Sequence, residues 1–183
     1  DTERWLLGFE NNGVLGRGWS SSIKTRRVSD SEYLEDLDSN LSLGKPQHLL
    51  STGSVNYSGA VWRHRIGMDR YQTLDPNITD PDRPHHRQPF TYTSAYAQWR
   101  GLDLNFNGSW INYAHDNAVN GHRMDIYPSL SKTFGSAGWY STSKLGVRHT
   151  QYELNDLQTT NELSPSRTTA IASVDSGLIF ERS

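Results

Sequence analysis

The chain has 183 residues, enough for one domain with a sizeable core, yet only 34% of them are hydrophobic. Its formal net charge of -2 provides no electrostatic basis for binding nucleic acid. The absence of cysteine excludes disulfides, thiol catalysis and cysteine-bound zinc within this chain. No run of about 18 apolar residues is present, so no transmembrane helix is predicted. With 6 Trp, 9 Tyr and 5 Phe, the composition suits a membrane β-barrel or a soluble β-sandwich.

Alternation of apolar and polar residues predicts an all-β fold, an antiparallel up-and-down meander of about nine strands. The most regular unit is a hairpin over residues 90–113, with arms of about ten residues and a two-residue turn at 100–101. The first turn is expected at residues 11–13. Pro128 falls inside a strand, which predicts a bulge or a local kink. The predicted strands are 4–10, 14–28, 47–57, 60–71, 90–99, 102–113, 122–133, 139–152 and 167–182.

Successive side chains in each strand point to opposite faces of the sheet, so the alternation defines two surfaces. The apolar surface, which we expect to face lipid, includes Trp62, Ile66, Leu102, Leu104, Phe106, Trp110, Val174, Leu178 and Phe180. The polar surface, which we expect to face a water-filled lumen, includes Arg63, Arg65, Asp69, Asp103, Asn105, Asn107, Arg123, Asp125, Lys144 and Arg148. These polar rows are the main candidates for function, and plain solvation of the lumen is the simpler alternative.

The predicted connections alternate between short and longer ones. The short connections are 11–13, 58–59, 100–101 and 134–138, and the longer ones are 29–46, 73–88, 114–121 and 153–166. Outer-membrane barrels have tight turns on the periplasmic side and longer loops outside, whereas a soluble sandwich has no reason to segregate its long loops. The pattern therefore favours a large membrane barrel. A smaller closed barrel that acts as a passive channel and a soluble carbohydrate-binding β-domain remain as alternatives.

Two of the longer loops contain candidate binding residues. The loop over 29–46 is acidic, and its carboxylates could bind a divalent cation through their oxygen atoms. The spacing of these carboxylates does not match an EF-hand loop, and a solvated surface is the simpler interpretation. The loop over 73–88 has a histidine pair and arginines that could contact phosphate, although two histidines without a third ligand are weak evidence for a metal. We expect no metal, no cofactor and no enzymatic activity, since no nucleophile-elbow motif places a catalytic triad. The loop residues of interest are Asp30, Tyr33, Asp36, Asp38, His85, His86 and Arg87.

Four segments resemble the LPS-assembly outer-membrane proteins of the LptD family (also called OstA or Imp), in the same order. They are residues 28–39 (VSDSEYLEDLDS), 127–131 (YPSLS), 144–152 (KLGVRHTQY) and 173–182 (SVDSGLIFER). In that family a periplasmic jellyroll domain precedes a very large barrel, the lipoprotein LptE plugs the barrel, and lipopolysaccharide passes through an opening between the first and last strands. The resemblance spans nearly the whole chain.

The resemblance implies that residues 1–183 are one internal segment of such a barrel, without the jellyroll, the family's cysteines or either seam strand. We therefore expect a piece of a longer protein that is integral to the Gram-negative outer membrane. The implied partners are LptE, lipopolysaccharide, outer-membrane lipids, the remaining strands of the same barrel, and a periplasmic lipopolysaccharide bridge reached through the absent N-terminal domain. The polar rows would then face LptE or the sugar and phosphate groups of lipopolysaccharide, where arginine suits phosphate.

Overall fold

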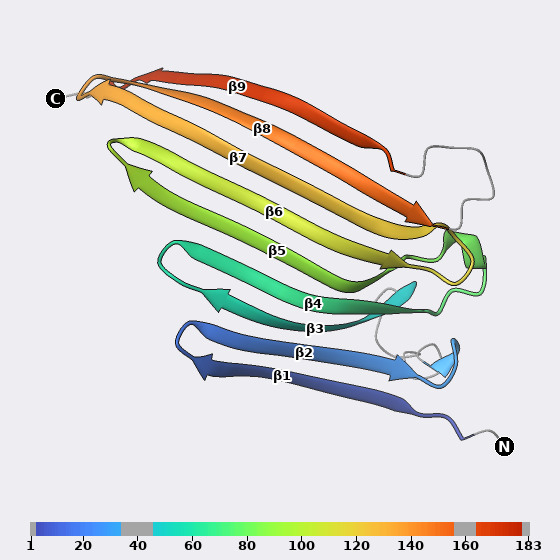
Figure 1. The fold of residues 1–183 in the computed structure, drawn as a ribbon. Coiled ribbons are helices and arrows are strands. Elements are labelled where there is room, and N and C mark those ends of the chain that lie inside the picture. Colours follow the sequence, from blue (N-terminus) through green and yellow to red (C-terminus); the bar gives the residue numbers. More distant parts are fainter. Residues whose placement is uncertain (1–2, 34–45, 156–163, 181–183) are drawn as a thin grey trace.

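A computed structural model describes residues 3–33, 46–155 and 164–180. Nine antiparallel strands form one sheet in which each strand pairs with the next along the chain, so the predicted all-β meander is confirmed (Figure 1). Among the described residues, no helix is both long and apolar enough to cross a membrane. The elements are β1 (Leu6–Gly16), β2 (Trp19–Val28), β3 (His48–Ser58), β4 (Trp62–Thr73), the short 3-10 helix η1 (Asp80–Asp82), β5 (His86–Trp99), β6 (Leu102–Ala114), β7 (Asn120–Ser136), β8 (Trp139–Asn155) and β9 (Ser166–Leu178).

The two ends of the sheet differ in their connections. Figure 1 shows the tight turns together at one end and the longer connections, with the N-terminus, at the other. The turns between β1 and β2, β3 and β4, β5 and β6, and β7 and β8 span two or three residues, so the predicted alternation of short and longer connections is confirmed. We refer below to the short-turn end and the long-loop end. Within the described residues the sheet is open, because β1 and β9 each pair with one neighbour only.

The first predicted turn is wrong. Residues 11–13 lie inside β1 and pair with β2, and the chain reverses instead at Arg17-Gly18. Arg17 and Gly18 have φ angles of 50° and 84°, as a two-residue hairpin turn of this hand requires. Asparagine and glycine favour turns locally, but cross-strand pairing with β2 outweighs that preference here.

Pro128 causes no bulge, so this part of the prediction is wrong, while the alternative of a local kink stays a prediction. The pairing of Pro128 with Phe106 on β6 is regular, and the register between β7 and β8 is the same on both sides of the proline. The ladder to β8 only lacks the pairs at Tyr127 and Pro128, because proline removes a donor while its fixed φ still allows extended backbone. The irregular registers lie elsewhere, between Val14 and Gly16 on β1, between Gly67 and Asp69 on β4, and between Arg87 and Phe90 on β5.

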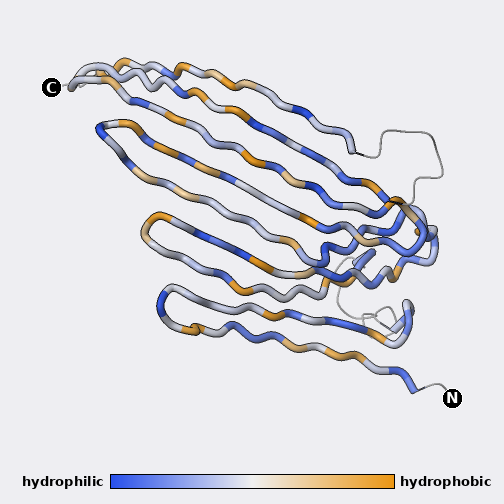
Figure 2. The backbone as a smooth tube through the Cα atoms, viewed as in Figure 1, coloured by the Kyte–Doolittle hydropathy of each residue, from blue (hydrophilic) through white to orange (hydrophobic). Residues whose placement is uncertain are grey.

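Burial in this sheet is the reverse of that in a soluble half-buried sheet. Phe90 (1% exposed), Asp69 (2%) and Asp125 (8%) all lie on the polar face, whereas Leu145 (62%) and Val174 (71%) are exposed on the apolar face. Figure 2 shows the alternation of hydrophobic and hydrophilic residues along the strands. A soluble β-domain would cover its apolar face with a second layer. The alternative of a soluble carbohydrate-binding domain is therefore not favoured.

Candidate functional surface on the polar face

Strand register places all the predicted polar residues on one face of the sheet. Arg63 pairs with Ser94 and Ser94 with Asn107, while Lys144 pairs with Ser131. The predicted apolar residues of the strands lie on the opposite face, and Phe180 follows the end of β9. The two sets therefore separate as the alternation predicts, while the assignment of one face to a lumen and the other to lipid stays a prediction.

Asp125 on β7 is the centre of a cluster with two arginines. Its carboxylate accepts bonds from Arg148 Nε at 3.1 and 2.9 Å and from the Thr150 hydroxyl at 2.6 Å. Arg123 Nη2 lies 3.6 Å from the same carboxylate. A buried carboxylate is tolerated only when it is paired and hydrogen-bonded, which is the situation here. Arg148 and Arg123 are thus engaged mainly with the sheet itself.

Asp69 and Arg87 form a second, more deeply buried pair. Residue 87 was expected in a loop, but β5 begins at His86, and Arg87 pairs with Asp69 in the register of β4 and β5. Arg87 Nη2 donates to Asp69 Oδ2, and Arg87 Nη1 donates to the Tyr92 hydroxyl at 3.1 Å. Arg87 therefore neutralises a strand carboxylate, so its guanidinium is not free in the loop as we had expected.

Phe90 is an important residue of this surface that our sequence reasoning missed. Its ring is buried on the polar face, with the guanidinium carbons of Arg65 and Arg87 at 5.5 and 5.2 Å from the ring centroid. Stacking of cations on an aromatic face holds both arginines close to the sheet. The sequence does contain a signal for this: Phe90 has an even number, whereas Ala95 and the other apolar residues of its strand have odd numbers, so alternation places Phe90 on the polar face.

A hollow of about 460 Å³ lies on the polar face. Its lining includes Arg63, Arg65, Asn56, Tyr92, Asn107 and Asp125, whose carboxylate is already bonded to Arg148 and Thr150. Within the part of the chain that the structure describes, neither Arg63 nor Arg65 has a carboxylate at ion-pair distance. Guanidinium groups match phosphate and carboxylate in shape and charge, so this hollow can bind an anion.

The remaining polar residues lie nearer the short-turn end. Asp103 accepts hydrogen bonds from the Tyr96 hydroxyl at 2.8 Å and from Gln98 Nε2 at 2.9 Å. Asn105 follows on the same face of β6, and the Lys144 ammonium lies 5.2 Å from the centroid of the Tyr127 ring. This part of the surface is an exposed mixture of charges and amides, as expected for a face that meets water.

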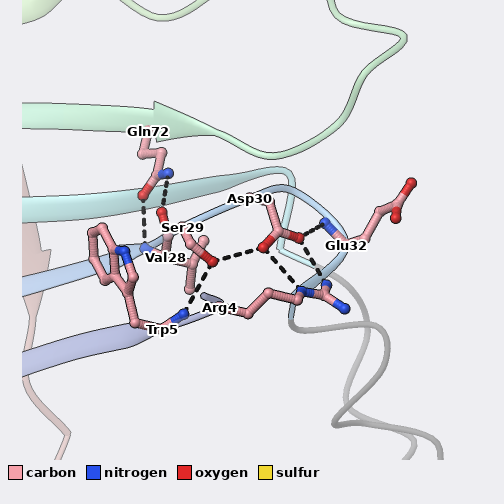
Figure 3. Close-up of polar contacts among 7 residues, drawn as sticks. All are labelled: Arg4, Trp5, Val28, Ser29, Asp30, Glu32 and Gln72. Atoms are coloured by element: carbon pink, nitrogen blue, oxygen red, sulfur yellow. Dashed lines mark hydrogen bonds and ion pairs between the residues drawn. The ribbon is translucent and has the colours of Figure 1, made fainter. Parts of the chain in front are cut away.

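Asp30 forms a compact polar cluster at the long-loop end (Figure 3). Arg4 donates to both carboxylate oxygens, from Nη2 at 2.7 Å and from Nε at 3.1 Å, and Ser29 Oγ and the Glu32 amide donate at 2.6 and 3.1 Å. The side-chain hydrogen bonds from Arg4 and then Ser29 lower the pKa of Asp30 to about 2. The carboxylate is therefore part of a structural clamp on the start of β1, and Trp5 extends this clamp by donating its amide to Ser29 Oγ at 3.1 Å.

A small apolar cluster supports this clamp. Tyr33 packs against Val28, Leu49 and Leu74, and the Arg4 guanidinium lies 5.7 Å from the Tyr33 ring centroid. Gln72 holds β2 by accepting from the Val28 amide at 3.0 Å and donating to its carbonyl at 2.8 Å, also drawn in Figure 3. The other predicted residues of the acidic loop, Asp36 and Asp38, lie outside the described residues.

The two histidines are engaged in packing at the rim. His85 Nε2 lies 2.8 Å from the Val119 carbonyl, which joins the connection after β4 to the connection after β6. His86 is the first residue of β5, accepts a bond from the Tyr71 amide at 3.2 Å through Nδ1, and stacks on the Tyr71 ring. His86 thus holds β4 and β5 together, and His85 holds two loops together.

The open meander, its exposed apolar face and its segregated turns fit one class of protein: the wall of a large β-barrel. Comparison with known proteins makes this specific. The model of the family described as "LptD: LPS transport system D" matches residues 2–183, and the chain belongs to this family.

Three relatives illustrate the match. Each is named "LPS-assembly protein LptD": the protein of Nitrosospira multiformis is 32% identical over 99% of this chain, that of Nitrosococcus oceani 32% over 100%, and that of Azoarcus sp. 36% over 98%. The chain spans 20%, 25% and 23% of the lengths of these relatives. The predicted family is therefore confirmed, and the predicted arc fits a sheet that covers only part of a larger protein.

Proposed function

We propose that this chain is a wall segment of an outer-membrane translocon that inserts lipopolysaccharide into the outer leaflet of the Gram-negative outer membrane. The observation that carries the proposal is the inverted burial of the sheet within an LptD-family sequence. An apolar face that stays exposed needs an apolar surrounding, and a lipid bilayer supplies one on the outside of a barrel. The short-turn end would then face the periplasm and the long-loop end the outside.

The polar face has a transport role in this proposal. Its hollow presents Arg63 and Arg65 without carboxylate partners among the described residues, and these groups suit the phosphates of lipopolysaccharide or acidic groups of a plug protein. LptE and the periplasmic bridge are the partners that the family implies for the whole protein. The segment itself acts without covalent chemistry, as a scaffold and a polar guide.

A charge scan on two adjacent residues tests which face meets lipid. Leu104→Arg and Asn105→Arg would be introduced separately into the full-length parent, and assembled barrel would be measured in isolated outer membranes. Arginine on the lipid face near mid-depth costs about 2–4 kcal/mol, whereas a luminal arginine costs little. We expect loss of assembly with the first variant and near-normal assembly with the second. Equal tolerance of both, or the reverse order, would refute the membrane assignment.

Site-specific photocrosslinking tests the transport role. A photoreactive amino acid at Asn107, on the polar face beside the hollow, is expected to form adducts with lipopolysaccharide in living cells. The matched position is Phe106, the preceding residue on the same strand, whose side chain points to the other face. Adducts at Asn107 that fall when Arg63 and Arg65 are replaced by Gln would support guidance by this surface. Absence of adducts at Asn107, with adducts at Phe106, would exclude it.

A further inference from the structure

The apolar face of the sheet carries an open groove of about 800 Å³. It follows two neighbouring rows of paired residues that run across the strands: one from Ala97 on β5 to Ala172 on β9, the other from Trp62 on β4 to Ala170 on β9. The lining is almost wholly hydrocarbon. The groove is thus a shallow channel that crosses six strands, from β4 to β9, and is larger than a gap between two neighbouring side chains.

The groove owes its depth to small residues set beside large ones. Alanines occupy both ends of the first row, and Ala95 and Ala170 occupy two positions of the second row. Pro128 lies in the middle of the second row, where the ladder between β7 and β8 lacks two pairs. Trp62 and Phe106 stand at one side with ring centroids 6.3 Å apart. A smooth lipid-facing wall would need larger side chains at these alanines, so the face is shaped for a flexible apolar chain.

A single basic group, Lys132, lies in the next row toward the short-turn end. It is two residues after Leu130, which lines the groove, and it pairs with Ser143 on the same face. Lys132 is exposed, its ammonium is 4.9 Å from the centroid of the Phe134 ring, and no carboxylate lies within ion-pair distance among the described residues. An unpaired ammonium at the short-turn edge of an apolar groove complements an anionic headgroup attached to an acyl chain.

We propose that this groove is a binding site for an anionic phospholipid, with one acyl chain in the groove and the headgroup phosphate at Lys132. This inference rests on the proposed function, because it requires the apolar face to lie in a bilayer. The site is nearer the short turns, which in the proposed orientation is the leaflet opposite to the one that receives lipopolysaccharide. Phospholipid is therefore the occupant, and the bound lipid would fill a depression in the barrel wall.

Lipid retention by the full-length protein tests the site. The protein would be purified in detergent, incubated with phosphatidylglycerol or phosphatidylethanolamine, and examined by native mass spectrometry. Lys132→Gln is expected to lower the apparent affinity for phosphatidylglycerol about fivefold, because one basic group near a membrane surface contributes about 1 kcal/mol. The combined change Ala170→Leu with Ala172→Leu fills the groove and is expected to reduce retention of both lipids.

Two matched variants control for general effects. Lys24→Gln on β2 removes the same charge from the opposite face, and Ser176→Leu adds a leucine side chain to the apolar face of β9 outside the groove. Both are expected to retain phosphatidylglycerol like the parent. If Lys132→Gln binds like the parent, or if filling the groove changes nothing, the site is refuted. That result is distinct from failure of the membrane assignment, which the Leu104→Arg variant reports independently.

Discussion

Two buried carboxylates organise the polar face, and they depend on their partners to different degrees. Asp69 relies on Arg87 alone for charge neutralisation among the described residues, and its Oδ1 has no hydrogen-bond partner there. Asp125 instead shares two arginines and the Thr150 hydroxyl. Loss of one arginine partner should therefore destabilise the barrel far more at Asp69 than at Asp125.

Replacement of these arginines tests that difference. Arg87→Met leaves a buried, unpaired carboxylate and is expected to destabilise the barrel by about 3 kcal/mol. Arg148→Met removes a half-exposed partner from a carboxylate that keeps two others, and is expected to cost less. The measurement is the temperature at which the full-length barrel loses its folded electrophoretic mobility. Adding Asp69→Asn to Arg87→Met should recover part of the loss, and absence of recovery would argue against an effect of the unpaired charge.

The clamp at Asp30 predicts a pH dependence at acidic pH only. Because folding lowers the pKa of Asp30 from 3.8 to about 2, the carboxylate stabilises the clamp above about pH 4, and this stabilisation is lost as the pH falls through about 2. Pepsin cleavage next to Tyr33 would be measured in the full-length protein at pH 4 and pH 1.5. Asp30→Asn is expected to be cut faster than the parent at pH 4 and equally fast at pH 1.5. A difference in cleavage rate between Asp30→Asn and the parent that persists at pH 1.5 would contradict a stabilising role of the Asp30 carboxylate.

At the scale of strands, aromatic rings cover glycines of the neighbouring strand. A Cβ on Gly146 of β8 would lie 2.7 Å from the Tyr127 ring of β7, and one on Gly177 of β9 would lie 2.5 Å from the ring of Tyr140. These rings lie flat on the polar face because the glycines leave room for them. The Lys144 ammonium near the Tyr127 ring depends on the same arrangement.

Gly146→Val should therefore displace the Tyr127 ring and destabilise the barrel by about 1–3 kcal/mol. The matched control is Gly53→Val on β3, where an added Cβ meets nothing within 4 Å and the stability should change little. The same thermal mobility assay compares the two variants. Tyr127→Ala added to Gly146→Val is expected to remove most of the extra cost, and equal destabilisation by both valine variants would contradict the explanation.

The strands and their faces could be predicted because alternation is a local property of the sequence. The meander, the hairpin over 90–113 and the separation of Leu104 from Asn105 all follow from it. The position of the first turn could not be predicted in this way. Residues 11–13 form part of β1 because they pair with β2, and the local sequence around 11–13 does not reveal that pairing. The pair of Asp69 and Arg87 likewise depends on a register shift between β4 and β5.

At the scale of the molecule, the sheet has two unpaired edges among the described residues, β1 and β9. Exposed strand edges attract further strands, so the segment needs the rest of its barrel. We expect residues 1–183, when refolded alone in detergent micelles, to form mixed oligomers with β-type circular dichroism. Size-exclusion chromatography with light scattering would show this. A homogeneous monomer that conducts ions in planar bilayers would instead favour the small closed channel.

The segregation of turns also determines where this wall can change its length. At the short-turn end, Arg17-Gly18 and Arg100-Gly101 reverse the chain in two residues with positive φ angles. An insertion there must shift the register of a hairpin or form a bulge, as between Val14 and Gly16 on β1. At the long-loop end, added residues cost little, since loop entropy grows slowly with length. Insertions and deletions among homologues should therefore collect at one rim, and that rim can acquire new binding surfaces while the opposite rim keeps its length.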